Sequence, residues 1–97
     1  MVAYLKVQWH HELPDEPVWL FSELDDERYE VRKVELFRDG SRTYADASRH
    51  SGSTMLGEIP TPSIAEFSEL EEFTALEIEP SEFEDQWINA VSLDGRD

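Results

Sequence analysis

Apolar and polar residues alternate through the first half of the chain, which is the pattern of half-buried β-strands. A first strand is predicted over residues 2–9, where Leu5, Val7 and Trp9 share one side. Pro14 and Pro17 interrupt the pattern before a second strand over residues 18–24. At one end of that strand the residues that point to either face are apolar, which favours a central position in the sheet.

A third, longer strand is predicted over residues 28–37. Its apolar phase changes across Arg32 and Lys33, and one extra residue in a β-bulge would restore it. Asp39-Gly40 then predicts a two-residue hairpin of type I′, in which both central residues have positive φ. The returning strand is expected over residues 42–47.

The second half of the chain begins with an aperiodic stretch, residues 48–61, that predicts a loop. Ser63-x-x-Glu66 is a capping-box pattern, which predicts a short helix. The residues expected on its buried side are Ile64, Phe67 and Leu70. A last strand is predicted over residues 74–79, with Ile78 and either Ala75 or Leu76 facing inward.

A second capping box, Ser81-x-x-Glu84, predicts the final helix, with Gly95 just beyond its end. Its apolar face is Phe83, Trp87, Ala90 and Val91, and its opposite face is Glu82, Asp85, Gln86 and Asn89. The expected fold is therefore a single α+β domain over residues 1–97. We expect an antiparallel meander of four or five strands with two helices in the C-terminal half.

Charge is distributed very unevenly along these 97 residues, whose formal net charge is −15. No lysine or arginine lies between Arg49 and Arg96. The same stretch carries Glu58, Glu66, Glu69, Glu71, Glu72, Glu77, Glu79, Glu82, Glu84, Asp85 and Asp94. Such a field favours a cationic partner, and it argues against direct binding to nucleic-acid backbones or anionic membranes.

The chain contains no cysteine, so neither disulfides nor thiolate metal ligands are available. No apolar run approaches the ~20 residues of a membrane span, and the N-terminus does not resemble a leader peptide. These features predict a soluble, cytoplasmic protein.

His10 and His11 form the strongest candidate for a metal site, but adjacent strand residues point to opposite faces. We expect His10 to end the first strand with a local hydrogen bond and His11 to be solvated. No metal or other cofactor is expected, because no set of His and carboxylates has convincing ligand spacing.

The third strand carries a second group of charged residues, in which Arg28, Glu30 and Arg32 are expected to share one face across from Glu23. Two carboxylates there could act as acid and base, but a cross-strand ladder of opposite charges is favoured. A third interpretation is that Arg32 binds a carboxylate of a peptide or ligand. Trp87 is expected in the core, whereas Trp19 has no clear place.

Several segments together resemble a family of small bacterial domains of unknown function. They are Trp9, Pro14-Asp15-Glu16-Pro17, the run from Ser22 to Phe37 followed by Asp39-Gly40, Tyr44-Ala45, Ile59-Pro60, and Ser81-Glu82-Phe83-x-x-x-Trp87. The resemblance covers most of the chain but implies no activity or catalytic residue. In size and acidity the chain is also similar to immunity proteins that neutralise bacterial toxins.

The sequence thus favours a non-enzymatic interaction protein, of the immunity type, that binds a basic toxin or nuclease. The partner-binding residues expected are Glu69, Glu71, Glu72, Glu82 and Asp85, with Trp19 and Arg32 on the sheet as the alternative surface. One competing hypothesis is a nucleic-acid mimic that blocks a DNA- or RNA-binding protein. The other is a small hydrolase that uses Glu23, Glu30 or Glu35.

Overall fold

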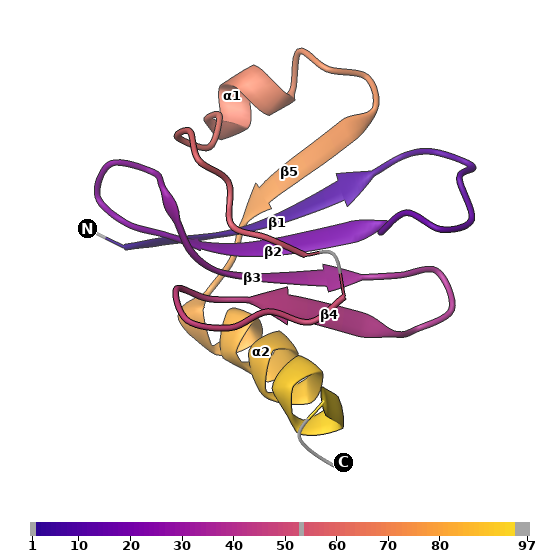
Figure 1. Cartoon of the computed structure of the whole chain (residues 1–97). Coiled ribbons are helices and arrows are strands. Elements are labelled where there is room, and N and C mark those ends of the chain that lie inside the picture. The colour runs from indigo at the N-terminus through magenta and orange to yellow at the C-terminus, as the bar shows by residue number, and fades with distance from the viewer. Residues whose placement is uncertain (1, 53, 95–97) are drawn as a thin grey trace.

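The computed structural model of the protein describes residues 2–52 and 54–94. Its elements are, in chain order, β1 (Ala3–Trp9), β2 (Trp19–Leu24), β3 (Glu30–Leu36), β4 (Arg42–Ala45), α1 (Ile64–Phe67), β5 (Phe73–Glu77) and α2 (Pro80–Asp94). The strands form one antiparallel sheet in the order β4-β3-β2-β1-β5 (Figure 1). The predicted α+β class and strand number are confirmed, and β5 returns to lie beside the first strand.

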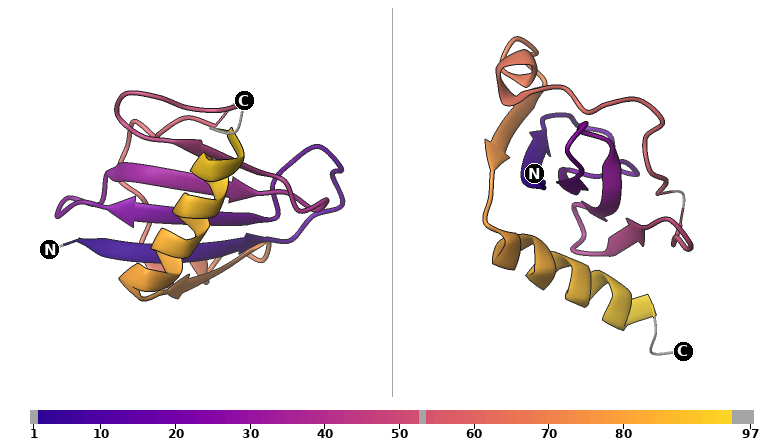
Figure 2. Two further views of the ribbon diagram at one scale, coloured as in Figure 1. Left: turned by 90° about the horizontal axis from the view of Figure 1, so that it is seen from below. Right: turned by 90° about the vertical axis from the view of Figure 1, so that its left-hand side faces the viewer.

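The strand β2 is the middle strand of the sheet, as its apolar pattern predicts. Phe21 is buried on one of its faces, whereas Ser22 and Leu24 are buried on the other. Both faces of the sheet are therefore covered, one by α2 and the other by the long connection between β4 and β5 (Figure 2).

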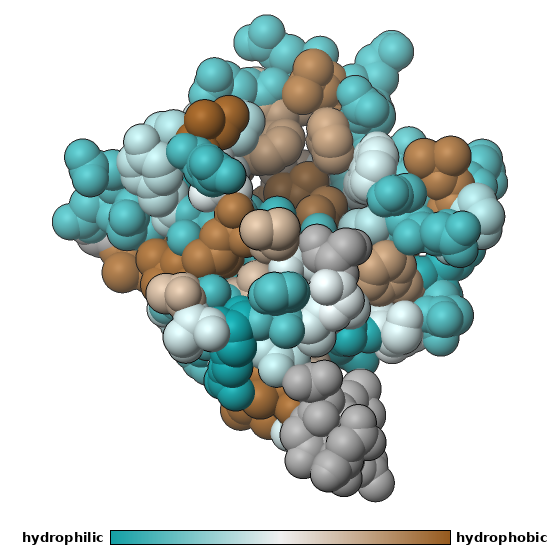
Figure 3. All heavy atoms as spheres, in the orientation of Figure 1, coloured by the Kyte–Doolittle hydropathy of each residue, from teal (hydrophilic) through white to brown (hydrophobic). Residues whose placement is uncertain are grey.

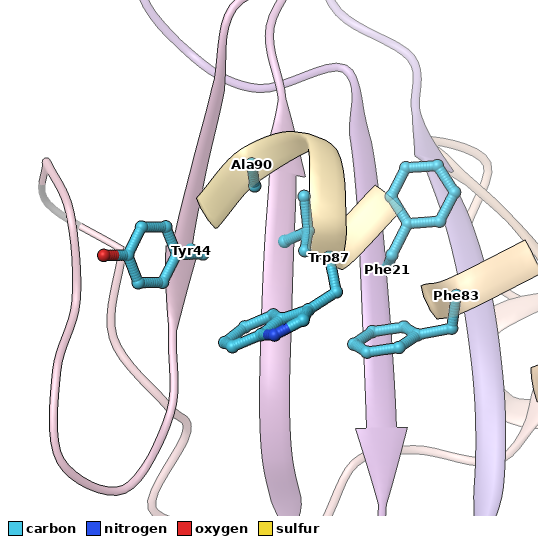
Figure 4. Packing of buried hydrophobic residues seen from close by; sticks show 6 residues of the cluster. Phe21, Tyr44, Phe83, Trp87 and Ala90 are labelled. Atoms are coloured by element: carbon cyan, nitrogen blue, oxygen red, sulfur yellow. The ribbon is translucent and has the colours of Figure 1, made fainter. Parts of the chain in front are cut away.

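The helix α2 packs across the first of these faces and completes the main core. Phe83, Trp87 and Ala90 form a buried cluster with residues of three strands, namely Phe21, Val34 and Tyr44 (Figure 4). Tyr44 meets Trp87 edge to face with ring centroids 5.4 Å apart, which is a favourable aromatic geometry. The predicted apolar face of the last helix is confirmed.

The start of α2 differs from the prediction. The helix begins at Pro80, so Ser81 lies inside the first turn and is not the residue that precedes it. Proline is well suited to the first helical position, because its missing N–H would have no partner there and its φ is already helical. Gly95, the expected C-terminal signal, lies outside the described residues.

The connection between β4 and β5 is held to the sheet by buried polar groups. Thr54 is 1% exposed, and its hydroxyl lies 2.5 Å from that of Thr43 and 2.6 Å from Glu35 Oε1. The backbone N–H of Gly57 donates to Glu30 Oε1 at 2.6 Å. These bonds anchor the first part of the connection, residues 48–61, whose described residues form no helix and no long strand, as predicted, apart from one bridge between Ala45 and His50.

The predicted bulge exists, but it lies one residue earlier than expected. Leu24 pairs with Glu30 and Glu23 pairs with Arg32, so Val31 is the extra residue. This shift turns Glu30 and Arg32 toward opposite faces of the sheet. The prediction that these two residues share one face is therefore wrong.

The hairpin after β3 is also of a different type. Gly40 has φ +91°, but Asp39 is not among the residues with positive φ, so the turn is not of type I′. The N–H of Gly40 donates to Phe37 O, and Phe37 N donates to Ser41 O, which closes a three-residue loop. Asp39 Oδ1 accepts from the N–H of Ser41, a local side-chain bond that stabilises this loop, and only Gly40 needs positive φ in it.

The first helix begins as predicted but buries less than expected. Ser63 and Glu66 form both bonds of the capping box. Ile64 and Leu70 are exposed, however, because α1 spans only four residues at the border of the sheet. In β5 the inward residue is Ala75, and Leu76 is 50% exposed. Exposed apolar side chains accordingly stand among hydrophilic ones around α1 and the connection that precedes it (Figure 3).

Replacing Phe83 with alanine is expected to lower the free energy of unfolding by about 3–5 kcal/mol, because it empties the centre of the main core. Ile88→Ala is the matched control, since Ile88 is on the same helix but 58% exposed. It should change stability by less than about 0.5 kcal/mol. Urea denaturation of both variants measures the difference, and equal effects would contradict this packing.

Candidate functional site

The densest charged cluster lies between the sheet and α2, around Arg32. Its Nε donates to Glu23 Oε1 at 2.6 Å, and its Nη1 donates to Glu84 Oε1 at 3.2 Å. The guanidinium carbon lies 4.9 Å from the Phe83 ring centroid and 5.1 Å from that of Trp87. One cation therefore links β3 to β2 through Glu23 and to α2 through Glu84 and two rings.

The protonation of this cluster is set by its mutual hydrogen bonds. Burial raises the pKa of Glu23, but hydrogen bonds from Arg32 and from the Tyr4 hydroxyl, 2.9 Å away, outweigh it and hold that pKa below its usual range. Hydrogen bonds to Glu23 and then to Glu84 raise the pKa of Arg32. The hydrogen bond to Glu23 likewise raises the pKa of Tyr4.

The expected cross-strand pair of Glu23 and Arg32 is present, but Arg28 takes no part in it. Arg28 has φ +69° and donates to the carbonyl oxygens of Thr61 and Pro62. Arg32 is already bound by two internal carboxylates, and its side chain is 20% exposed. It is thus committed to the fold, which argues against its proposed role as an anchor for a partner's carboxylate.

The three acids of the hydrolase hypothesis are divided between the two faces of the sheet. Glu23 faces α2, whereas Glu30 and Glu35 face the long connection. Glu30 lies 3.4 Å from Lys33 Nζ and accepts from Ser22, and Glu35 accepts from Thr54. Neither Glu30 nor Glu35 lies beside Glu23. Each of them instead forms a hydrogen bond that holds the connection in place.

Trp19 lies in a depression of about 640 Å³ at one end of the sheet. Its lining includes Gln8, Leu36, Arg38 and Arg42. The ring of Trp19 stacks on Phe21 with centroids 6.4 Å apart, and Lys6 Nζ lies 5.0 Å from its centroid. The position of Trp19 could not be predicted from the sequence, because residues of the β3 to β4 hairpin form part of the wall of this depression.

The two neighbouring histidines have separate structural roles. His10 Nε2 lies 2.7 Å from the hydroxyl of Thr74 on β5, so its bond is not local as expected. His11 is not simply solvated either: its Nε2 donates to Pro17 O at 2.8 Å, and its Nδ1 accepts from Leu13 N at 2.9 Å. Those partners require the neutral tautomer with the proton on Nε2. Among the described residues, no three His or acidic side chains group closely enough to hold a metal ion.

The acidic residues expected to bind a partner do not form one surface. Glu69, Glu71 and Glu72 are exposed between α1 and β5, whereas Glu82 and Asp85 are on α2, beyond the opposite side of the sheet (Figure 1). Asp85 is exposed, but Glu82 binds Lys6 Nζ at 3.1 Å. The expectation that Glu82 projects freely from the outer face is therefore wrong, because the β1 lysine lies beneath it.

Comparison with known families supplies one match. Residues 3–92 match the family described as Domain of unknown function (DUF6881). The chain belongs to this family. No curated protein and no solved structure matches it. The function of this family is unknown, so a functional proposal for the chain depends on the geometry of its described residues. In the described part of the chain, no helix is both long enough and apolar enough to cross a membrane.

Replacing Glu23 with glutamine should cost about 1.5–3 kcal/mol at pH 7, the usual value of a hydrogen bond to a charged group. Because the pKa of Glu23 is lower in the folded chain, its stabilisation is present above the unfolded value of about 4.3 and is lost as pH falls through the folded value. The gap between wild type and variant, measured by thermal unfolding, should therefore close at acidic pH. Glu72→Gln, an exposed control, should show almost no gap at any pH.

Treatment with a chelator should leave the melting temperature unchanged, since no described cluster offers a set of metal ligands. Calorimetry of tag-free protein before and after chelation measures this. A stoichiometric metal in elemental analysis, together with a lower melting temperature after its removal, would contradict the expectation.

Proposed function

We propose that the protein is a non-enzymatic interaction domain that binds a basic protein partner, as an immunity-type inhibitor of a toxin or nuclease does. The observation that supports this most directly is an imbalance in ion pairing. Every described cation is bound within the chain, whereas the acids that cluster around β5 have no side-chain partner among the described residues.

Each described lysine and arginine side chain has a partner within the chain. Lys6, Arg32, Lys33 and Arg49 each form a salt bridge to a carboxylate of the chain. The remaining described cations bind uncharged groups: Arg28 the carbonyls of Thr61 and Pro62, Arg38 the carbonyl of His11, and Arg42 the amide of Gln86. Little positive charge is thus left to attract an acidic partner.

The acids around β5 differ from this pattern. We define the acidic border as Glu69, Glu71, Glu72, Glu77 and Glu79, which are all exposed. Within the described ranges none of their side chains takes part in a hydrogen bond or ion pair. Their mutual repulsion is uncompensated in the isolated domain, so a basic surface placed against them would gain attraction without first breaking an internal pair.

A basic partner explains this arrangement physically. Surfaces that bind nucleic-acid backbones are rich in lysine and arginine, so a nuclease offers a complementary field. Such fields accelerate encounter and exclude wrong partners, and salt weakens them, since the Debye length is about 8 Å at physiological ionic strength. The hydrolase alternative receives no comparable support, because its acids are divided between two faces and bound internally.

Two charge-reversal variants with equal net charge test the proposal. The first replaces Glu69, Glu71, Glu72 and Glu77 with lysine. The second, as control, replaces four other exposed acids, Glu12, Asp15, Glu27 and Asp85, with lysine. Association with a compact basic protein such as lysozyme should slow about tenfold more in the first variant than in the control. Stopped-flow fluorescence at low salt measures both rates.

Equal slowing in the two variants would show that only the total charge matters and would contradict a role for the acidic border. Failure of the wild-type protein to bind the basic probe at low salt would overturn the proposed function itself. Circular dichroism establishes that both variants remain folded, which is expected because exposed charges contribute little to stability.

A further inference from the structure

We propose that the outer edge of β5 is a docking site for an extended basic segment of the partner, which would add to the sheet as a sixth strand. We define this β5 edge as the outward backbone groups of Phe73, Ala75 and Glu77. The inference rests on the proposed function and specifies the surface and the conformation of the bound segment.

The register of the β1 and β5 pair identifies the outward groups. The N–H of His10 donates to Glu72 O, and the N–H of Ile78 donates to Tyr4 O. In an antiparallel pair the residues bonded to the neighbouring strand alternate with residues whose N–H and C=O point away. The even-numbered residues of β5 therefore bond to β1, and the odd-numbered ones point outward.

Most of these outward groups have no hydrogen-bond partner among the residues that the structure describes. Phe73 N donates to Leu70 O at 3.1 Å, which closes one end of the edge. The backbone groups of Ala75 and Glu77 bond to no described residue beyond the sheet. Ala75 is 9% exposed, so Glu77, which is exposed, is the more accessible of the two. In Figure 2 no segment of the ribbon runs alongside the free border of β5.

The other border of the sheet shows how this chain covers an edge. The outward N–H of Tyr44 on β4 is not left to solvent, because it donates to Ser51 Oγ at 3.0 Å. The carbonyl of Tyr44 accepts from Ser51 N at 2.8 Å, and Ala45 forms a bridge with His50. The chain thus pairs its β4 edge with its own connection, whereas no described residue pairs with Ala75 or Glu77 on the β5 edge.

The side chains around the β5 edge select the occupant by charge. Glu71 and Glu72 precede the strand, Glu77 ends it and Glu79 follows it. Leu76, 50% exposed, adds an apolar contact on the strand itself. A second copy of the chain would bring a second row of acids against the first, so charge disfavours a homodimer here. A segment that alternates lysine or arginine with apolar residues complements the edge.

Two substitutions of Glu77 distinguish the contribution of its backbone N–H to peptide binding from that of its carboxylate. Glu77→Ala removes the carboxylate and keeps the N–H, whereas Glu77→Pro removes both. Proline is tolerated on an edge strand where the N–H faces outward, so the bonds to β1 should remain. The probes are a ten-residue peptide of alternating lysine and valine and, as a compact control, lysozyme.

The peptide should bind Glu77→Pro about tenfold more weakly than Glu77→Ala, whereas lysozyme should bind the two variants equally. In the wild-type protein, the peptide should slow hydrogen exchange at the amides of Ala75 and Glu77. Exchange at Thr74 and Leu76, which already bond to β1, should change much less. This second measurement needs no variant, so it decides the matter even if the proline variant fails to fold.

Each result has a distinct meaning. Peptide binding without protection of Ala75 and Glu77 would overturn strand addition and leave the proposed function standing. In that case the glutamates would serve only to keep the edge from pairing, as charged residues on edge strands often do. Absence of binding to both the peptide and lysozyme would overturn the proposed function together with the docking site.

Discussion

The fold depends above all on one cation held between two layers. Arg32 bridges Glu23 on β2 and Glu84 on α2, and its guanidinium lies against Phe83 and Trp87. In a chain of net charge −15, two acids brought together beneath a helix would repel each other. With Arg32 between them they join the helix to the sheet. The bulge at Val31 makes this possible, because it turns Arg32 toward α2.

The same constraint explains how the sheet carries different chemistry on its two faces. On the α2 side, aromatic rings surround a charged bridge. On the other side, Glu30 and Glu35 hold a connection of irregular backbone through Gly57 and Thr54. Carboxylates that could suggest catalysis in the sequence thus hold the structure together, whereas the exposed acids around β5 form no side-chain bond within the described residues.

The sequence predicts elements better than it predicts their contacts. Alternation and helical spacing depend on burial alone, so the strands and the apolar face of α2 were predicted correctly. The errors occur where two local signals compete. Ser81 resembled a cap, but Pro80 occupies the first helical turn, and Asp39 stabilises a three-residue loop in place of a two-residue turn. The pairing of Lys6 with Glu82 joins residues 76 apart, and no periodicity contains that information.

The pairing of β5 with β1 has a consequence for the order in which the molecule is made. Strands β1 to β4 are neighbours in sequence and can pair as soon as they leave the ribosome, but β1 then has one unpaired side. The backbone N–H and C=O groups of Lys6 and Gln8 point to that side, and they stay unpaired until residues 73–77 emerge. A nascent chain stalled before that point would present an unpaired strand edge to its neighbours. The emergence of β5 replaces that edge with one flanked by glutamates, which disfavours pairing with other copies of the chain.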